Sequence, residues 1–430
     1  MKYYYTILSI LFFLPLFGQE NSSQWLKNSA NLKIKPVIGL QLWSSYTMGA
    51  EKYNITTGLY EKVDNRLNFQ IRRTRLGIKG QAYKQLKFNL TAALDLVGRD
   101  LLAGTEGGGN NGASPNFRIW NAWVQWKINA KSEAFNLTFG YFVPQIGRES
   151  ITAALRSTSM EKSWSQNYLR RHLTGIGPGR AVGMNLGGLF YEEDQKVAIS
   201  YDVGIFNPVF ESYGGNSIGD DYAPLLVGRV AFHFGDPEFD KYTFGHKVNY
   251  FGKRKGLTLA IAGATQGKTD LFTQNQAFGI DLLFNWKAFN IDGEWTYIKR
   301  GGAILNADSA SDFIVNANTG YARMSYNITM KNQFILEPVL MLVQFNGPLS
   351  FEEQTDALNV SSLSGREQIV NIGFNLYPNP DLKISLHYNF RNADAGELSA
   401  GVNINNYFYQ SGVGAIHRGD WLGLGVVAIF

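Results

Sequence analysis

Residues 382–391 read LKISLHYNFR. Every second side chain is aliphatic or aromatic, and the side chains between them are charged or polar. Because successive side chains of a β-strand point to opposite faces, this pattern predicts a strand with one apolar face and one polar face. At about ten residues, such a strand is long enough to cross a lipid bilayer at a tilt.

The same alternation recurs along the rest of the chain. Sixteen segments show it, at residues 35–46, 66–79, 86–96, 116–128, 134–143, 179–190, 196–206, 224–234, 256–265, 276–286, 289–299, 319–328, 332–345, 367–377, 382–391 and 420–430. An even number of antiparallel strands closes a barrel with both chain ends on one side. A soluble sandwich or propeller is the alternative, but its strands average about five or six residues and need no large aromatic face turned away from the core.

The connections between these segments alternate in length. Tight ones such as NAKS, KA, TMK and YPNP alternate with long ones at 97–115, 144–178, 300–318, 346–366 and 392–419. We therefore predict an all-β fold, a transmembrane antiparallel β-barrel of about 16 strands with short periplasmic turns and long extracellular loops. The segment 235–255 does not fit, because it is long and falls on the side of the short turns.

The two ends of the chain indicate export and assembly. Residues 1–18 carry a short apolar run after Lys2, which is typical of a cleaved signal peptide. We expect 19–34 to be a short periplasmic segment and 35–430 to form the barrel, in the outer membrane of a Gram-negative bacterium. Phe430 ends the last strand, and a terminal aromatic of this kind resembles the signal read by the barrel-assembly machinery. Contacts with membrane lipid and lipopolysaccharide follow from this location.

The cluster Arg72, Arg73 and Arg75 lies in the middle of the second segment. Apolar residues are odd-numbered before this cluster and even-numbered after it, so the strand must slip by one residue. A β-bulge near Arg72 and Arg73 would do this and would turn all three arginines into the lumen. Two alternatives remain, in which an arginine reaches a lipid headgroup or only pairs with a carboxylate of the lumen.

Other charged residues are expected to face these arginines across the pore. The predicted lumen faces carry an opposing acidic wall of Asp95, Asp202, Asp281, Asp292 and Glu294. The longest loop, 144–178, adds the basic residues Arg148, Arg156, Lys162, Arg170 and Arg171. Loops of this length are usually functional or disordered. Its apolar residues favour an inward fold that constricts the pore, and an exposed surface loop is the alternative.

Several short motifs resemble one family. FQIRRTRLGIKG (69–80) resembles the F-x-I-R-R-A-R-L-G-x-K-G segment of the phosphate-selective porins of the O and P porin family, and GYFVPQIGRES (140–150) resembles its G-Q-F-x-x-P-x-G-x-E. NAWVQWKI (121–128), VGIFNP (203–208) and LEPVL (336–340) also lie where the family has similar strands. The resemblance implies a sixteen-stranded trimeric porin with an inward third loop whose arginines guide anions. The chain departs from the family at Tyr141 and Val143, and its fifth loop offers only Lys268.

These observations predict an outer-membrane porin for passive diffusion of small hydrophilic solutes, leaning to anions such as phosphate or oligophosphate. The alternatives are a general non-selective porin and a plugged receptor or adhesin barrel. The five histidines lack a catalytic partner set and the chain has no cysteine, so we expect no enzyme, no cofactor and no metal site. The charge of +5 lies far short of a nucleic-acid binder's. The expected partners are small anionic solutes and two further copies of the chain, in a homotrimer.

Overall fold

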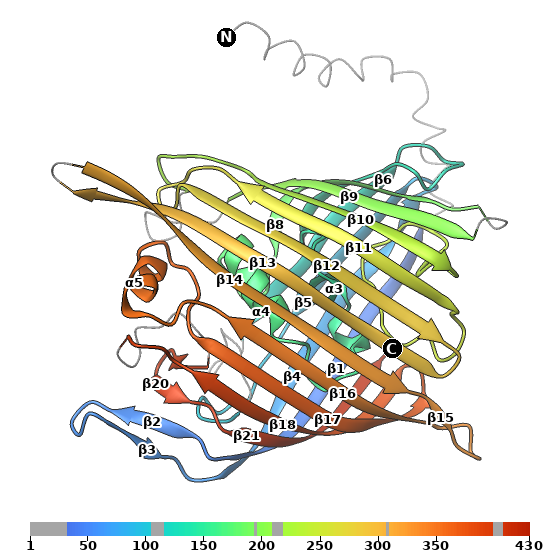
Figure 1. Cartoon of the computed structure of the whole chain (residues 1–430). Helices are drawn as coiled ribbons and strands as arrows, with labels where there is room; N and C mark the ends of the chain where they lie inside the picture. Colours follow the sequence, from blue (N-terminus) through green and yellow to red (C-terminus); the bar gives the residue numbers. More distant parts are fainter. Residues whose placement is uncertain (1–31, 105–115, 193–195, 209–217, 307–308, 399–406) are drawn as a thin grey trace, which may run out of the picture.

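The computed structural model describes residues 32–104, 116–192, 196–208, 218–306, 309–398 and 407–430. It is a closed β-barrel crossed inside by short helices (Figure 1). The expected signal peptide, 1–18, and nearly all of the expected segment 19–34 lie outside the described residues. Among the described residues, no helix is long and apolar enough to cross a membrane.

Sixteen antiparallel strands form the barrel wall, as the alternating segments predict. In their order around the wall, they are β1 (Lys33–Met48), β4 (Arg66–Tyr83), β5 (Leu86–Ala93), β6 (Arg118–Lys127), β7 (Asn136–Phe142), β8 (Ala181–Phe190), β9 (Val197–Phe206), β10 (Leu225–Gly235), β11 (Gly256–Gln266), β12 (Gln274–Trp286), β13 (Phe289–Asn306), β14 (Ser309–Tyr326), β16 (Ile335–Asn346), β17 (Arg366–Asn379), β18 (Leu382–Asp394) and β21 (Asp420–Ile429). The two-residue β15 (Ile328–Thr329) continues β14 along β16. β1 pairs with both β21 and β4, which closes the wall and leaves no open edge.

The two faces of the wall have the expected polarity. On β21, Leu422 and Leu424 are exposed on the outside, whereas Trp421 is buried on the inside. Gly423 and Gly425 also face inward, and a Cβ at Gly423 would lie 2.7 Å from the Met160 side chain. The last strand therefore has glycines at the inward-facing positions where Met160 lies against the wall.

One long loop expected from the sequence, 300–318, is instead mostly strand. β13 continues to Asn306 and β14 begins at Ser309, so the two strands extend as a hairpin beyond their neighbours (Figure 1). The expectation was wrong because polar residues favour loops only where a strand needs an apolar face, and paired strands that extend beyond the barrel wall need none. At the same end lie α5 (Phe351–Asn359) and a small sheet of β2 (Glu51–Asn54), β3 (Leu59–Lys62), β19 (Tyr409–Gln410) and β20 (Gly414–His417).

Candidate functional site

Two β-bulges mark the part of the wall that faces the open lumen. Gln41 of β1 pairs with Arg73 and Leu42 pairs with Ile71, which leaves Arg72 as the extra residue on β4. The bulge predicted from the slip in alternation is therefore confirmed. A second bulge, which the sequence analysis missed, lies on β6, where Trp120 is the extra residue. Each bulge lets two consecutive residues face the lumen.

The three arginines of β4 face the lumen and contact two carboxylates. Arg72 and Arg73 both pair with Glu161, and the Arg72 Nη2–Glu161 Oε2 distance is 2.5 Å. Arg75 Nη1 lies 2.6 Å from Asp95 Oδ1. Burial would raise the pKa of Glu161, but the positive charges of Arg72 and Arg73 outweigh it and lower that pKa to about 2. Glu161 is therefore ionised at neutral pH and offsets part of the positive charge.

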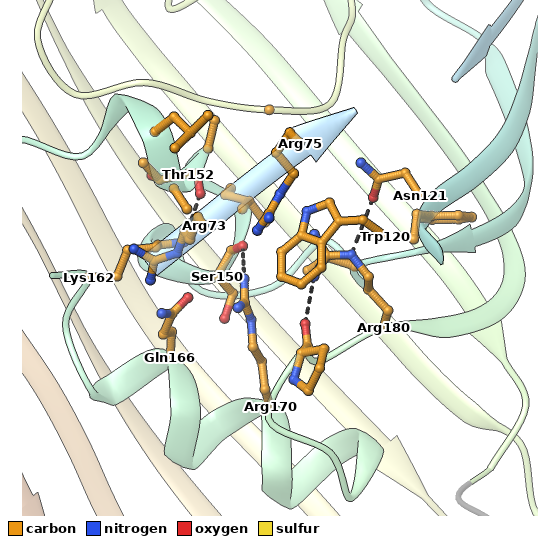
Figure 2. Close-up of a pocket in the computed structure, with 18 of the residues that line it drawn as sticks. Arg73, Arg75, Trp120, Asn121, Ser150, Thr152, Lys162, Gln166, Arg170 and Arg180 are labelled. Carbon is orange, nitrogen blue, oxygen red and sulfur yellow. Dashed lines mark hydrogen bonds between the residues drawn. The ribbon is translucent and has the colours of Figure 1, made fainter. Parts of the chain in front are cut away.

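Trp120 lies between two guanidinium groups. The Arg75 Cζ is 3.7 Å from the centre of the Trp120 ring and the Arg180 Cζ is 3.4 Å from it (Figure 2). Arg180 also donates to Asn121 Oδ1 at 3.3 Å and to the Pro178 carbonyl at 2.7 Å. Because the indole face is electronegative, it attracts both cations and holds them close to each other despite their like charge.

The segment 143–180, which we call the inserted loop, runs across the lumen. It contains α3 (Arg148–Ile151), the 3₁₀ turn η2 (Ala154–Arg156) and α4 (Ser165–Thr174), which ends at Gly175 with a left-handed φ of 68°. The loop reaches β1, where Gln41 Nε2 donates to the Met160 carbonyl, and β18, where Lys383 Nζ donates to the Ser157 carbonyl. The loop residue Arg148 is fully buried, and Tyr168 is buried.

The acidic residues of the wall face the lumen, but the inserted loop covers them. Arg148 lies 2.9 Å from Asp281 on β12, and it also lies 2.8 Å from Glu238. Arg323 of β14 binds both Glu149 of the loop, at 3.0 Å, and Asp292 of β13, at 2.5 Å.

Glu294 is also covered by the inserted loop, whereas Asp202 is covered by Tyr242, which lies between β10 and β11. Glu294 accepts from the Ser165 hydroxyl at 2.6 Å and from the Glu149 amide at 3.0 Å. Asp202 accepts from Asn185 and from the Tyr242 hydroxyl.

The structure therefore does not contain the expected acidic wall exposed to the pore opposite the arginines. Asp281 and Glu294 are buried anchors for the loop, Asp292 is buried beside Arg323 of the wall, and Asp95 lies on the basic wall beside Arg75. Arg148 is likewise used as an anchor and is 0% exposed. The reason is that a buried carboxylate requires a charged or hydrogen-bonding partner. Arg148 and Ser165 of the loop supply some of these partners, and Arg229 and Arg323 of the wall supply the others.

Apolar packing fills the same side of the lumen. Tyr168 stacks on Phe345 of β16 with ring centres 4.0 Å apart, and Leu169 and Leu173 of α4 join one buried cluster with residues of β10 to β14. Small side chains of the wall, among them Ala262 and Ala277, leave room for α4. Side chains of α4 and of the wall therefore pack tightly in this half of the lumen.

A cavity of about 730 Å³ remains between the inserted loop and the wall from β1 to β6 (Figure 2). Two carboxylates, Asp95 and Glu161, line it, together with ten basic side chains: Arg72, Arg73, Arg75, Lys79, Arg118, Arg156, Lys162, Arg170, Arg171 and Arg180. Of the expected pore residues, all but Arg148 line this cavity.

Several of these cations have no carboxylate within 4.0 Å among the described residues, and three of them, Lys162, Arg170 and Arg180, belong to the inserted loop. Lys162 Nζ donates to the Thr152 carbonyl at 2.7 Å, and Arg170 donates to the Ser150 carbonyl. Gly179, with a φ of 65°, lies against Arg170, and a Cβ there would be 2.2 Å from the Arg170 side chain. The loop backbone therefore holds these cations at the cavity without neutralising them.

Sequence reasoning missed Trp120, Arg180 and Glu161 as parts of this site. The strongest available signal was a second loss of alternation, in RIWNAWV (118–124), which marks the bulge on β6. The pairing of Glu161 with residues about 90 positions earlier has no local signal. Arg229 and Arg323 neutralise the acidic wall, and their pairing with Asp281 and Asp292 could likewise not be predicted from the sequence.

The site offers little for catalysis or metal binding. Ser200 Oγ lies 3.0 Å from His233 Nε2, but the other ring nitrogen faces Thr258 Oγ1 at 2.9 Å rather than a carboxylate. Within the described residues, no three His, Asp or Glu side chains are grouped to hold a metal ion. The arrangement is suited to attracting anions, because its donors are charged and its cavity is open.

Comparison with known proteins agrees with this geometry. The model of the family described as phosphate-selective porin O and P matches residues 46–201. The resemblance is confirmed. The match contains both bulges and the whole inserted loop. A search of curated proteins finds no match.

Solved porins share the fold at low sequence identity. The outer membrane channel DcaP of Acinetobacter baumannii is 12% identical, with a TM-score of 0.55 over 93% of this chain and 98% of that one. An anion-selective porin from Comamonas acidovorans is 12% identical, with a TM-score of 0.55 over 93% and 100%. Salmonella typhi OmpF in complex with daunomycin is 12% identical, with a TM-score of 0.52 over 94% and 99%. The family match and the closed barrel together support a porin channel of the Gram-negative outer membrane.

Proposed function

We propose that the chain is a porin that favours small anions, of which phosphate, oligophosphate and organic anions are the expected solutes. The observation that carries the proposal is the cavity beside β1 to β6, where ten basic side chains face two carboxylates. An excess of one charge sign in a narrow cavity with low-dielectric walls raises the local concentration of the opposite ion. Cations would be disfavoured for the same reason.

The chemistry of the cavity also favours oxyanions over simple halides. Arg170 and Arg180 present guanidinium groups, which bind two oxygens of a phosphate or carboxylate at once. Lys162, when protonated, adds a point charge on the same cavity. The family description and the anion selectivity of the Comamonas porin support this assignment.

A plugged barrel is the second candidate, and one observation favours it. The inserted loop and its packing fill the lumen from β10 to β16, so the open cross-section is small. A plugged barrel would carry no ion current, whereas a porin would.

We further propose a homotrimer whose long loops face outward and whose inserted loop constricts each pore. Lipid, lipopolysaccharide and the barrel-assembly machinery are its expected partners, with Phe430 as the assembly signal. Cleavage of residues 1–18 on export belongs to the same proposal. Chemical crosslinking in native membranes would test the trimer, and capture of monomers alone would contradict it.

Planar-bilayer recording tests the main proposal. The reversal potential under a salt gradient should indicate anion preference, and added phosphate should reduce the chloride current. In the variant Arg170→Gln with Arg180→Gln, the barrel should form and both effects should weaken, because the two guanidinium groups lack carboxylate partners among the described residues. A cation-selective wild type, or a wild type with no current, would overturn the proposal.

A further inference from the structure

The 236–255 segment, between β10 and β11, is the feature that the strand pattern left unexplained. It has 20 residues, whereas the other connections at the same end of the barrel have between two and eight. The segment is nevertheless well packed, since Tyr242 and Val248 are each 1% exposed. Such burial is unusual for a turn, because turns normally run over the surface.

The segment enters the lumen and contacts walls on several sides. Tyr242 donates its hydroxyl to Asp202 of β9 and accepts from Asn185 of β8 at 3.1 Å. Further along, Asn285 of β12 donates to the Val248 carbonyl at 3.0 Å, and Asn249 donates to Glu337 of β16 at 2.8 Å. The segment therefore extends across the barrel from β8 to β16.

It is also joined to the inserted loop. The His246 amide donates to the Ile151 carbonyl at 3.2 Å, and the Ala153 amide donates to the His246 carbonyl at 2.9 Å. Glu238 pairs with Arg148 at 2.8 Å and with His246 Nδ1 at 2.8 Å. All the polar side chains of this joint are buried. The two segments thus form one hydrogen-bonded unit inside the lumen.

The space that this unit leaves open follows one side of the barrel. Phe244 and Gly245 of the segment border the main cavity. A second cavity of about 260 Å³ lies toward the short-turn end and is lined by Lys247 and Lys253 of the segment, together with Lys383. Leu155, Arg156 and Ile429 line both cavities, which places the two cavities next to each other.

We propose that the 236–255 segment is a second constriction element. With the inserted loop, it confines solutes to a single path beside β1, β4 and β21, and it limits the size of the solute that passes. Lys247 and Lys253 continue the basic lining to the short-turn end of the path, so they add to the anion preference. This charge contribution rests on the proposed function, whereas the limit on size does not.

Thiol labelling tests the position of the segment in the path. The chain has no cysteine, so a single introduced cysteine is the only site of reaction. Lys247→Cys and Lys253→Cys should each lose at least half of the single-channel current when an anionic methanethiosulfonate reagent reacts. Lys241→Cys is the matched control, because Lys241 is exposed on the same segment and lines neither cavity. Unchanged current at both test positions, or an equal loss at the control, would overturn the proposal.

Shortening the segment tests the limit on size. Replacing residues 239–252 with a short Gly-Ser linker retains Glu238, the partner of Arg148, and should let larger uncharged sugars enter proteoliposomes. An unchanged exclusion limit would overturn the proposal. Sugars carry no charge, so this result is independent of anion preference, and a cation-selective wild type would refute the proposed function alone. If the shortened chain does not assemble, the labelling experiment decides.

Discussion

The two halves of the lumen contain similar side chains and have opposite characters. In the covered half, beneath the inserted loop, Arg148 and Arg323 each bind two carboxylates and are fully buried. In the open half, beside β1 to β6, two carboxylates face ten cations. The difference shows that the role of a charged side chain in the lumen depends on whether it is buried and whether it is paired. A buried arginine that is paired with two carboxylates cannot attract a solute.

The largest expected effect is on stability, from a change in the covered half. Arg148→Ala leaves Glu238 and Asp281 short of a buried partner, which typically costs about 3–5 kcal/mol. Arg156→Ala, in the same loop, removes a partly exposed pair with Asp381, which is worth about 0–1 kcal/mol. Denaturant unfolding in detergent and protease cleavage of the loop would compare them. Equal stability of the two variants would contradict the assignment of Arg148 as an anchor.

The next effect is on selectivity, from a change in the open half. Replacing Arg72, Arg73 and Arg75 with Gln leaves Glu161 without its partners and should lower the anion-to-cation permeability ratio several-fold. The shift should be largest at low salt, where screening is weak. The control removes the same charge from the long-loop end, at Lys52, Lys62 and Lys268, and should change the ratio little. Failure of the triple arginine variant to assemble, with the ratio unchanged in any protein that does assemble, would mean that the arginines are structural.

A smaller effect is expected at Trp120, which holds two cations of the open half. Trp120→Ala removes the close cation–π contacts with Arg75 and Arg180 and a longer one with Arg118, each worth about 0.5–2 kcal/mol, and should weaken the block of chloride current by phosphate. Trp126→Ala, on the lipid-facing side of the same strand, should leave the block unchanged. Block by phosphate is the informative measurement, because a purely structural role would not alter it. Equal block in both variants would show that Trp120 does not position the arginines.

The smallest expected effect is a dependence on pH. Burial, followed by the positive charge of Arg170, lowers the pKa of Lys162 well below its ordinary value. Lys162 is neutral above this lowered pKa and charged below it, so the anion preference should rise as the pH falls. Glu161, with a pKa of about 2, stays ionised over this range. Reversal potentials at several pH values would show the trend in the wild type and a weaker trend in Lys162→Gln. An identical trend in both proteins would exclude Lys162 as its source.

The wall of the barrel could be predicted from the sequence because its determinants are local. Alternation fixes which residues share a face, and the slip near Arg72 predicts the bulge that the pairing of Gln41 with Arg73 confirms. The hairpin at the end of β13 and β14 was missed, since strands outside the membrane lose the apolar face on which the prediction depended.

The contents of the lumen could be predicted only in part because their determinants are long-range. The arginines were recognised as residues of the lumen, but the partners of Arg148 are 90 and 133 positions away and have no pattern in common with it. The 236–255 segment was visible only as an excess of length. Which charges are neutralised depends on how the inserted loop and the 236–255 segment pack in the lumen. No periodic pattern in the sequence predicts this packing.

One measurement tests directly whether the open half sets selectivity while the covered half does not. Glu161→Gln and Glu337→Gln remove the same charge by the same chemistry, but Glu161 lines the main cavity and Glu337 is buried among Asn249, Ser325, Asn375 and Tyr377. Under a salt gradient, Glu161→Gln should shift the reversal potential toward stronger anion preference, and Glu337→Gln should keep the wild-type value. Equal shifts in the two variants, or a larger shift in Glu337→Gln, would contradict the account.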